Sequence, residues 1–358
     1  MLFTKLRSIN ARILPQHLFY GPNWLVLGVN NICNLHCKMC DVGVQYSESN
    51  FYHHLMGAKP VNMPLDLMSN IINQAATYYP NVKLGFAFTE PLIYPHLIES
   101  LKMAKSKNLR TAITTNALNL RRYAEGILDS GLDNLFISLD GPPDIHNFIR
   151  GNPSSFEKAM EGIEYLLTKN NHPEIHVFCT ITEWNIGHLV EFVKIFSHLK
   201  LKQIGFLHMN FTSLSIANTQ NEKFPKYKST SSNMSAIDIN NMDLRLLWKE
   251  MQELQSMVLD FPVNFSPNIK SREILDVYYH HPEIFIGKRC NDAYSNIMIK
   301  SNGDVIPAHG RCYDITLGNM YQQDIKTIWN ASSSARFRQD LNAVGGLMPA
   351  CSRCCSAF

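Results

Sequence analysis

The sequence predicts an α/β fold built on a mainly parallel sheet, and three observations support this prediction. Six short apolar runs of strand character recur along roughly the first 210 residues, helix-period segments lie between them, and the connections are long enough for crossover helices. Parallel strands with right-handed crossovers form either a doubly wound sheet or a barrel. In both architectures, binding and catalytic residues gather at the carboxyl ends of the strands.

The predicted elements alternate regularly from residue 24 to residue 210. The strand-like runs span 24–30, 82–88, 109–115, 133–139, 174–182 and 202–209. The helix-period segments span 65–79, 96–107, 120–131, 154–170 and 186–199. With 358 residues and 45% hydrophobic content, the chain can bury one large core and a smaller second one.

An N-terminal extension, residues 1–23, precedes the first strand. Its apolar residues fall on one helical face with basic residues nearby, namely Leu2, Leu6, Ile9 and Ile13 with Lys5, Arg7 and Arg12. We expect this helix to dock on the rest of the fold through its apolar face. The alternative is a helix that binds a membrane surface.

The alternation stops after residue 209. Residues 211–241 are rich in Ser, Asn and Thr, which indicates a polar linker or mobile loop. A helix is predicted from about residue 242 to residue 260. It opens a C-terminal region, residues 242–358, of mixed strands and turns.

Composition argues against several classes of protein. The net charge of +3 is spread along the chain, which is not the footprint of a nucleic-acid-binding protein. No apolar run approaches the roughly 18 to 20 residues of a membrane span, and the first residues lack a secretory signal. We therefore expect a cytoplasmic protein with no nucleic-acid partner and no membrane span.

The segment CNLHCKMC (33–40) places Cys33, Cys37 and Cys40 directly after the first strand. A disulfide framework is disfavoured because nine cysteines is an odd number and the chain is long. In a reducing compartment, such a cluster indicates metal or redox chemistry. Three thiolates in one tight loop leave one iron of an iron–sulfur cube open for another ligand. Zinc, with His36 as fourth ligand, is the alternative.

Three further segments follow later strands in order: AFTEPLIYP (87–95), TTNA (114–117) and SLDGPPDIHNFIRG (138–151). Together with the C-x3-C-x2-C motif, they resemble the radical S-adenosylmethionine (radical SAM) superfamily over roughly residues 24–210. The resemblance implies a partial (β/α)6 TIM-like barrel that binds a [4Fe-4S] cluster and S-adenosylmethionine (SAM). The chain departs from the family where Phe88 and Thr89 replace two glycines and where Ala117 replaces a third.

The resemblance assigns roles to the thiol and charged groups. Cys33, Cys37 and Cys40 would ligate three irons, and the fourth iron would chelate the amino and carboxylate groups of SAM. Glu90 matches the glutamate that faces the positive ammonium of SAM, and Arg150 would pair with the SAM carboxylate in a forked geometry. The alternative for Arg150 is an ordinary surface ion pair.

Four more residues are implied as SAM contacts. Thr115, Asn116 and Ser138 would hydrogen-bond the ribose hydroxyls and the methionine moiety, with turn or cap roles as the alternative. Met39 would cover the adenine. One electron from a reductant such as flavodoxin or ferredoxin would cleave the sulfonium bond, and the resulting 5′-deoxyadenosyl radical would abstract a hydrogen atom from the substrate.

The C-terminal region carries a second group of cysteines. Its segments RCNDAYSNIMIKSNGDVIPAHGRC (289–312), LGNMYQQDIKTIWN (317–330) and PACSRC (349–354) resemble the auxiliary-cluster domain called twitch, a shortened form of the SPASM extension. The resemblance implies a small C-terminal domain that holds an auxiliary [4Fe-4S] cluster with four thiolates: Cys290, Cys312, Cys351 and Cys354. A structural zinc is the alternative.

The spacing of these cysteines departs from the family pattern at one ligand. That pattern has a cysteine five residues after the position of Gly303, where this chain has Ala308. The nearest cysteine is Cys312, so His309 is the alternative ligand. Cys355 is expected to take no part, or to replace the cysteine before it.

Other reactive residues are expected to be structural. Cys179 on the fifth strand is predicted to be a core residue. The adjacent pairs His53–His54 and His280–His281 lack the spacing of metal ligands on one face, so they are predicted to lie at the surface.

The two resemblances imply a radical SAM oxidoreductase that oxidises a small polar substrate such as a sugar, an aminoglycoside or a nucleotide-like molecule. A ribosomal-peptide maturase or epimerase is the alternative, which we rank lower because 23 residues before the first strand are too few for a leader-recognition domain. A non-catalytic iron–sulfur redox sensor is an alternative of another class. The implied SAM contacts at positions 90, 138 and 150 argue against a sensor.

Overall fold

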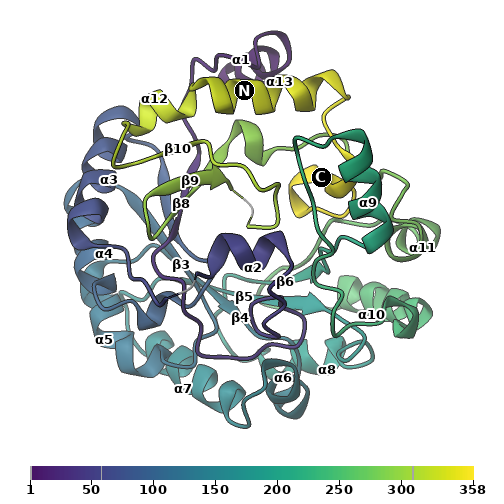
Figure 1. The fold of residues 1–358 in the computed structure, drawn as a ribbon. Coiled ribbons are helices and arrows are strands. Elements are labelled where there is room, and N and C mark those ends of the chain that lie inside the picture. The colour runs from purple at the N-terminus through teal and green to yellow at the C-terminus, as the bar shows by residue number, and fades with distance from the viewer. Residues whose placement is uncertain (1, 58, 309) are drawn as a thin grey trace.

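The computed structural model describes residues 2–57, 59–308 and 310–358, which form one continuous sheet surrounded by helices (Figure 1). The described residues form ten strands in the order β10, β9, β8, β1, β2, β3, β4, β5, β6, β7. Neighbouring strands are parallel from β8 across β1 to β7, whereas β8, β9 and β10 pair antiparallel. The strands are β1 (Trp24–Gly28), β2 (Lys83–Phe86), β3 (Arg110–Thr115), β4 (Asn134–Ser138), β5 (Glu174–Ile181), β6 (Gln203–His208), β7 (Val263–Ser266), β8 (Asn296–Lys300), β9 (Asp304–Pro307) and β10 (Gly318–Asn319).

All six strands predicted from the sequence are present, and the parallel α/β prediction is confirmed. The sheet nevertheless extends beyond them at both sides, since β7 pairs with β6 and β8 pairs with β1. Because β8 comes from the C-terminal region, that region continues the barrel sheet instead of standing apart from it. The free edge of β1 offers unpaired N–H and C=O groups, and β8 satisfies them.

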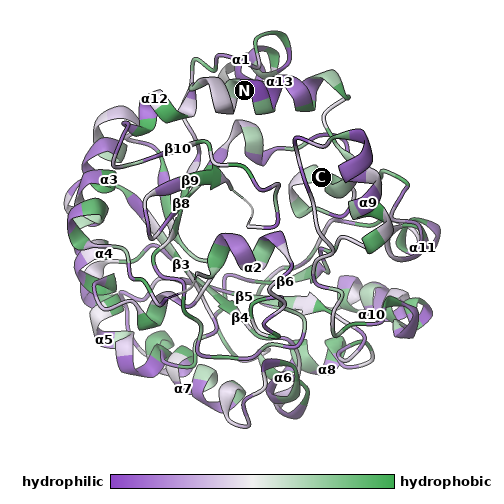
Figure 2. Ribbon diagram, in the orientation of Figure 1, coloured by the Kyte–Doolittle hydropathy of each residue, from purple (hydrophilic) through white to green (hydrophobic). Residues whose placement is uncertain are grey.

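Helices pack against the outside of the sheet (Figure 1). Helix α5 (Leu120–Ser130) buries residues spaced three or four apart and ends at Gly131, whose φ of 67° suits glycine at a left-handed cap. In Figure 2 the outer helices carry both hydrophobic and hydrophilic residues, as amphipathic helices do. Within the described ranges, no helix combines the length and apolar character needed to cross a membrane. Further helices, besides α1, α2 and α9 described below, are α3 (Leu65–Tyr78), α4 (Leu97–Ser106), α6 (Pro143–Arg150), α7 (Ser155–Leu167), α8 (Leu189–Ile195), α10 (Leu244–Ser256), α11 (Arg272–His280), α12 (Ile325–Trp329) and α13 (Ser332–Ala343).

Helix α1 (Leu2–Ile13) docks differently from the prediction. It contacts the rest of the protein through Asn10 and Ala11, which are buried. The Asn10 side chain donates to the carbonyl of His17 and accepts from the N–H of Phe19, which anchors the helix by polar contacts. The predicted apolar face is solvent-exposed, with exposed fractions of 43%, 52% and 70% for Leu6, Ile9 and Ile13.

The segment 211–241 also differs from the expected mobile loop. It contains helix α9 (Leu214–Lys223), whose first turn is capped by the Ser213 hydroxyl. Further along, the Ser232 hydroxyl and the Asn233 N–H donate to the two carboxylate oxygens of Asp41, at 2.6 and 2.7 Å. Asp41 directly follows the cysteine motif and is fully buried. The polar residues of this segment therefore form specific hydrogen bonds rather than a solvated linker.

One buried arginine fastens the cysteine-bearing chain end to helix α11. Arg353 lies between two of the predicted auxiliary ligands and is 1% exposed. Its guanidinium donates to the carbonyl oxygens of Val277 and His281, each at 2.7 Å, and to that of Tyr278. The last carbonyls of a helix have no partner within the helix, and a cation beside them also complements the helix dipole.

Replacing Arg353 with Met keeps the side-chain length and removes every donor. We expect the free energy of unfolding to fall by roughly 3 kcal/mol or more, because several buried carbonyls lose their partners. Arg336→Met, at an exposed position of α13, is the control and should change it by less than about 0.5 kcal/mol. Denaturant titration of both variants checks the prediction, and similar losses in the two would contradict the anchoring role.

Candidate active site

The cysteine loop lies between β1 and the short helix α2 (Asn50–Leu55). The Cys40 N–H donates to the carbonyl of Cys37 at 3.2 Å, so the backbone turns sharply between these two ligands. Gly43 faces the same turn, where a Cβ atom would lie 2.4 Å from the Cys37 carbonyl oxygen and 2.5 Å from its nitrogen. Only glycine fits this approach, and the loop can therefore fold back over the thiols.

The thiols of Cys33, Cys37 and Cys40 suit an iron–sulfur cluster. Burial, with the nearby Cys37 thiol as a smaller cause, raises the pKa of Cys33 to about 12 and that of Cys40 to about 11. Three neighbouring thiolates therefore need positive charge beside them, which iron supplies. His36, the fourth ligand of the zinc alternative, is exposed. Among the described residues, no three His, Cys, Asp or Glu side chains are arranged as ligands of a single metal ion.

Glu90 is buried at the end of β2, and its carboxylate is held from three sides. Oε1 accepts from the Thr115 hydroxyl at 2.6 Å and from the Leu92 N–H at 2.9 Å, and Oε2 accepts from the Asn116 N–H at 2.8 Å. Burial raises the pKa of Glu90, against the opposing effect of these hydrogen bonds. A carboxylate has about four acceptor sites, so one site on Oε2 is left for a cationic ligand. Thr115 supports Glu90 in this structure, and its contact with SAM stays a prediction.

The remaining residues implied as SAM contacts differ in whether their side chains are free to bind a ligand. The Asn116 side chain is already engaged, because Nδ2 donates to Asn34 at 2.8 Å and Oδ1 accepts from the Leu118 N–H at 3.0 Å. Ser138, at the end of β4, is half-buried, and its hydroxyl has no hydrogen-bond partner among the described residues. Met39 is buried and packs in the main core. Ser138 is therefore the hydroxyl best placed to accept a new partner.

At two positions where the family pattern has glycine, this chain has another residue with its backbone in the left-handed region. Phe88 has a φ of 83° and Ala117 a φ of 60°, both in the left-handed region. Such a conformation costs an L-residue roughly 1–2 kcal/mol. These residues flank the strand ends that carry Glu90 and Thr115, so the chain preserves the local path of the backbone at the expense of strain.

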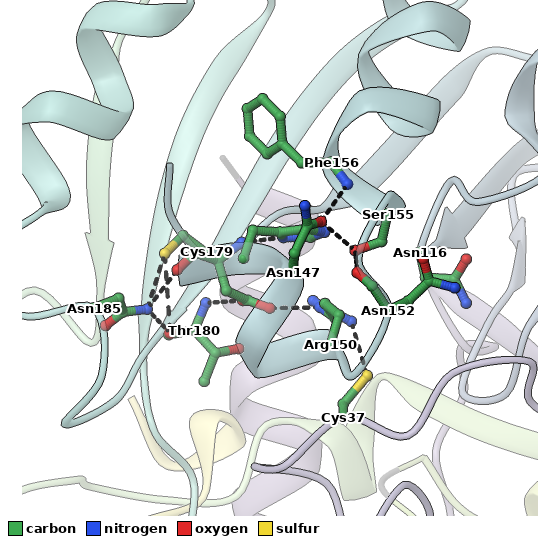
Figure 3. Close-up of polar contacts among 12 residues, drawn as sticks. Cys37, Asn116, Asn147, Arg150, Asn152, Ser155, Phe156, Cys179, Thr180 and Asn185 are labelled. Atoms are coloured by element: carbon green, nitrogen blue, oxygen red, sulfur yellow. Dashed lines mark hydrogen bonds and ion pairs between the residues drawn. The ribbon is translucent and has the colours of Figure 1, made fainter. Parts of the chain in front are cut away.

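Arg150 reaches the cysteine loop from the end of α6. Its Nε donates to Asp140 Oδ2 at 2.6 Å, and its Nη1 lies 3.6 Å from Cys37 Sγ (Figure 3). Burial lowers the pKa of Arg150, but Asp140 and Cys37 raise it by more, so the guanidinium stays charged. The ion pair is buried rather than at the surface. Nη2 has no partner among the described residues, and it is the group available to a SAM carboxylate.

Asp140 was not identified from the sequence as a site residue, although it lies within the SLDG segment (138–141). Its Oδ1 accepts from the Thr180 N–H at 2.9 Å, and Asn185 Nδ2 donates to its carbonyl at 2.9 Å. Asn185 also lies 3.6 Å from the Cys179 thiol, which is buried in the core as predicted (Figure 3). The network therefore joins the ends of β4 and β5 to the cysteine loop.

The cysteines of the chain end converge on a second place. The Tyr313 hydroxyl lies 3.0 Å from Cys351 Sγ beside it. His309, the alternative to Cys312, lies outside the described residues. Cys355 is not among the residues that line the cavity. One cavity is lined by all four predicted auxiliary ligands: Cys290, Cys312, Cys351 and Cys354.

Helix α2 connects the two cysteine sites. Asn50 Nδ2 donates to the carbonyl of Cys312 at 3.3 Å, and His54 Nδ1 donates to the carbonyl of Gly310 at 2.7 Å. His54 is therefore buried, and its prediction as a surface residue is wrong. The three other histidines of the two adjacent pairs are exposed: His53, His280 and His281.

Family comparison agrees with this arrangement. A family model described as the radical SAM superfamily matches residues 28–194. Residues 28–194 form a radical SAM domain. A second model, SPASM, described as an iron–sulfur cluster-binding domain, matches residues 290–355. Both resemblances predicted from the sequence are thereby confirmed.

Curated relatives of this radical SAM chain share about a quarter of their residues with it. The AdoMet-dependent heme synthase of Oleidesulfovibrio alaskensis is 26% identical over 173 residues, which are 48% of this chain and 41% of that protein. The probable GTP 3′,8-cyclase of Methanococcus maripaludis is 28% identical over 164 residues, 44% of this chain and 51% of that protein. The chain thus spans about half the length of the curated relatives it matches.

Solved structures resemble the whole radical SAM and SPASM arrangement. Streptococcus suis SuiB bound to the precursor peptide SuiA has a TM-score of 0.63 at 16% identity, covering 94% of this chain and 71% of that one. Native anSMEcpe with bound AdoMet has a TM-score of 0.60 at 18% identity, covering 88% of this chain and 82% of that one. These likenesses confirm the fold.

The family defines the cofactors. A radical SAM protein with a SPASM domain carries a [4Fe-4S] cluster, an auxiliary cluster and SAM, as predicted. The cluster ligands and SAM contacts named above stay predictions for this chain, and the structure brings them together at the two places described.

Replacing Ala117 with Gly tests the strained backbone. We expect the free energy of unfolding to rise by about 0.5 to 1 kcal/mol, because relief of the left-handed strain exceeds the entropy that glycine adds to the unfolded chain. Ala76→Gly, in the interior of α3, is the matched control and should lower it by about 1 kcal/mol. Denaturant midpoints compare the two, and a loss at position 117 would argue against strain there.

Proposed function

We propose that this protein is a radical SAM oxidoreductase that dehydrogenates a small polar substrate, such as a sugar, an aminoglycoside or a nucleotide-like molecule. One observation carries the proposal: four cysteines line a single cavity in the C-terminal region. A cluster held there by four thiolates has no open iron for a substrate. Its role is then to accept an electron, and a reaction that delivers an electron to it is an oxidation of the substrate.

When bound, the cofactors would supply one-electron cleavage of SAM and abstraction of a hydrogen atom from the substrate, and the substrate would then lose a proton and an electron. The side chains at the barrel mouth position SAM for this chemistry. Glu90 offers the remaining acceptor site of Oε2 to the SAM ammonium, and Arg150 offers Nη2 to its carboxylate. Ser138 is free to bond a ribose hydroxyl, and Met39 contributes apolar surface for the adenine.

The proposal also requires an electron donor and a reducing location. A flavodoxin or ferredoxin supplies the electron, as such carriers transfer one electron at a time. All nine cysteines are free thiols in this structure, which accords with a cytoplasmic location.

A ribosomal-peptide maturase or epimerase is the second candidate, because the solved structure of SuiB, similar in fold, is bound to a precursor peptide. A non-catalytic redox sensor is the third. An anaerobic assay for 5′-deoxyadenosine against a pool of sugars, nucleotides and peptides separates the three. A sensor would release no substrate-dependent 5′-deoxyadenosine, and the member of the pool that stimulates release identifies the substrate class.

Glu90→Gln tests the SAM site. The variant loses the negative charge that faces the SAM ammonium, a charge-assisted contact of roughly 1.5 to 3 kcal/mol, so we expect the dissociation constant of SAM to rise at least tenfold. Equilibrium binding to the reconstituted protein measures it. Glu99→Gln, at an exposed position of α4, is the control and should bind SAM normally. Normal affinity in Glu90→Gln would remove this residue from the site.

Changing both Cys351 and Cys354 to Ala tests the electron-acceptor role. We expect the reconstituted protein to lose about four of about eight irons, to retain SAM cleavage, and to form no oxidised product. Cys355→Ala, the neighbouring control, should retain both the iron and the product. Iron analysis and mass spectrometry of the product provide the measurements. Continued turnover in the double variant, or a product isomeric with the substrate, would favour epimerisation.

A further inference from the structure

A basic hollow lies between the N-terminal helix α1 and the segment that carries Cys290. Its volume is about 730 Å³, within the size range of ligand-binding clefts. No Asp or Glu side chain is found among the described residues that line it, and the one carboxylate there is the terminal group of Phe358. Four cationic side chains line it: Arg7, Arg12, Lys288 and Arg289. We call this feature the basic hollow.

Two of the four cations are fixed in place. Arg7 Nη1 donates to Asn23 Oδ1 at 2.6 Å, and its guanidinium carbon lies 4.6 Å from the centre of the Tyr20 ring. Arg289 Nη2 donates to the Ala11 carbonyl at 3.0 Å, and its guanidinium also stacks on an aromatic ring. Such contacts hold positive charge at a defined position without neutralising it.

The other two cations are exposed. In the described part of the chain, the side chains of Arg12 and Lys288 have neither an ion-pair nor a hydrogen-bond partner. Their charges are therefore available to an incoming anion. The apolar residues exposed on α1 do not line the hollow, which separates this feature from the apolar face of that helix.

The hollow adjoins the auxiliary cavity through Cys290, which lines both. The backbone around Cys290 is also bonded to the chain end just beyond Cys354. The Lys288 N–H donates to the Ala357 carbonyl at 2.8 Å, and the Asn291 N–H donates to the Ser356 carbonyl at 2.9 Å. The wall of the hollow thus carries one predicted ligand of the auxiliary cluster, Cys290, and the hollow is a short route from that cluster to the surface.

We propose that the basic hollow docks the acidic surface of a small one-electron carrier protein of the flavodoxin or ferredoxin class, which removes the electron from the auxiliary cluster. The carrier gains one electron and the cluster loses one, so the cluster is ready for the next turnover. This inference rests on the proposed function, in which the substrate delivers an electron to that cluster. Charge complementarity selects the partner, because a concave site lined by four cations and no acidic side chain attracts an anionic surface.

The test measures the affinity of oxidised flavodoxin for the reconstituted protein without substrate. Reversing the two exposed charges, Arg12→Glu with Lys288→Glu, is expected to weaken binding at least tenfold. The matched control reverses two exposed lysines of α4 and its end, Lys102→Glu with Lys107→Glu, and should bind normally. Raising the salt from about 0.1 M to about 1 M shortens the Debye length from roughly 10 to 3 Å, and it should weaken wild-type binding far more than binding by the charge-reversed variant.

Unchanged affinity in the charge-reversed variant would overturn the proposal. So would loss of binding to anionic lipid vesicles or to pyrophosphate without loss of binding to flavodoxin, since the hollow would then serve a membrane or a small anion. A single-turnover assay separates this proposal from the proposed function. The variant should form 5′-deoxyadenosine and oxidised product normally in one turnover and slow only in later ones. An isomeric product with flavodoxin binding still dependent on Arg12 and Lys288 would refute the oxidation and leave the docking site standing.

Discussion

The site depends on one buried ion pair, between Arg150 and Asp140. Burying two charges is costly unless each finds hydrogen bonds as well as the opposite charge. Asp140 meets this requirement through the Thr180 N–H, and Arg150 meets it through the Cys37 thiol. The pair therefore fixes the end of α6 against both the sheet and the cysteine loop. A second charged contact of the same loop, Lys38 Nζ at 4.4 Å from the centre of the Phe148 ring, also reaches α6.

The two cysteine sites are also joined to each other. Asp41, next to Cys40, holds the segment at Ser232 and Asn233, and Asn50 holds the carbonyl of Cys312. The segment that follows the radical SAM motif therefore also contacts the backbone of Cys312, a predicted auxiliary ligand. A few polar contacts of Asp41 and Asn50 thus link the first cysteine site to the segment 211–241 and to the backbone at Cys312.

The strands and the cysteine motif could be predicted from the sequence, because the patterns that define them are local. The strands follow from apolar runs of the right length, and the cysteine motif is defined by spacing alone. The partners of Asp41 could not be predicted, because Ser232 and Asn233 lie 191 and 192 residues away. The thiol of Cys37 reads only as a ligand, which hid its contact with Arg150. Asp140 is only ten residues from Arg150, but no spacing rule pairs the two. The pairing of β8 with β1 could not be predicted either, because the two strands lie about 270 residues apart in the chain. The predicted docking face of helix α1 was wrong for a different reason. An amphipathic pattern identifies an apolar face but not what covers it, and Asn10 anchors the helix instead.

The pairing of β8 with β1 has a consequence for how the protein is made. Trp24 of β1 pairs with Asn296 of β8, so β1 cannot form this pairing until about 270 further residues have been synthesised. At roughly 5 to 20 residues per second, synthesis of that stretch takes on the order of 15 to 50 s. During this time one edge of β1 is open and the radical SAM cysteines already exist, while the auxiliary cysteines do not. For most of this time the chain holds the predicted ligands of the first cluster and none of the predicted auxiliary ligands, so the strand order itself makes the first site available before the second.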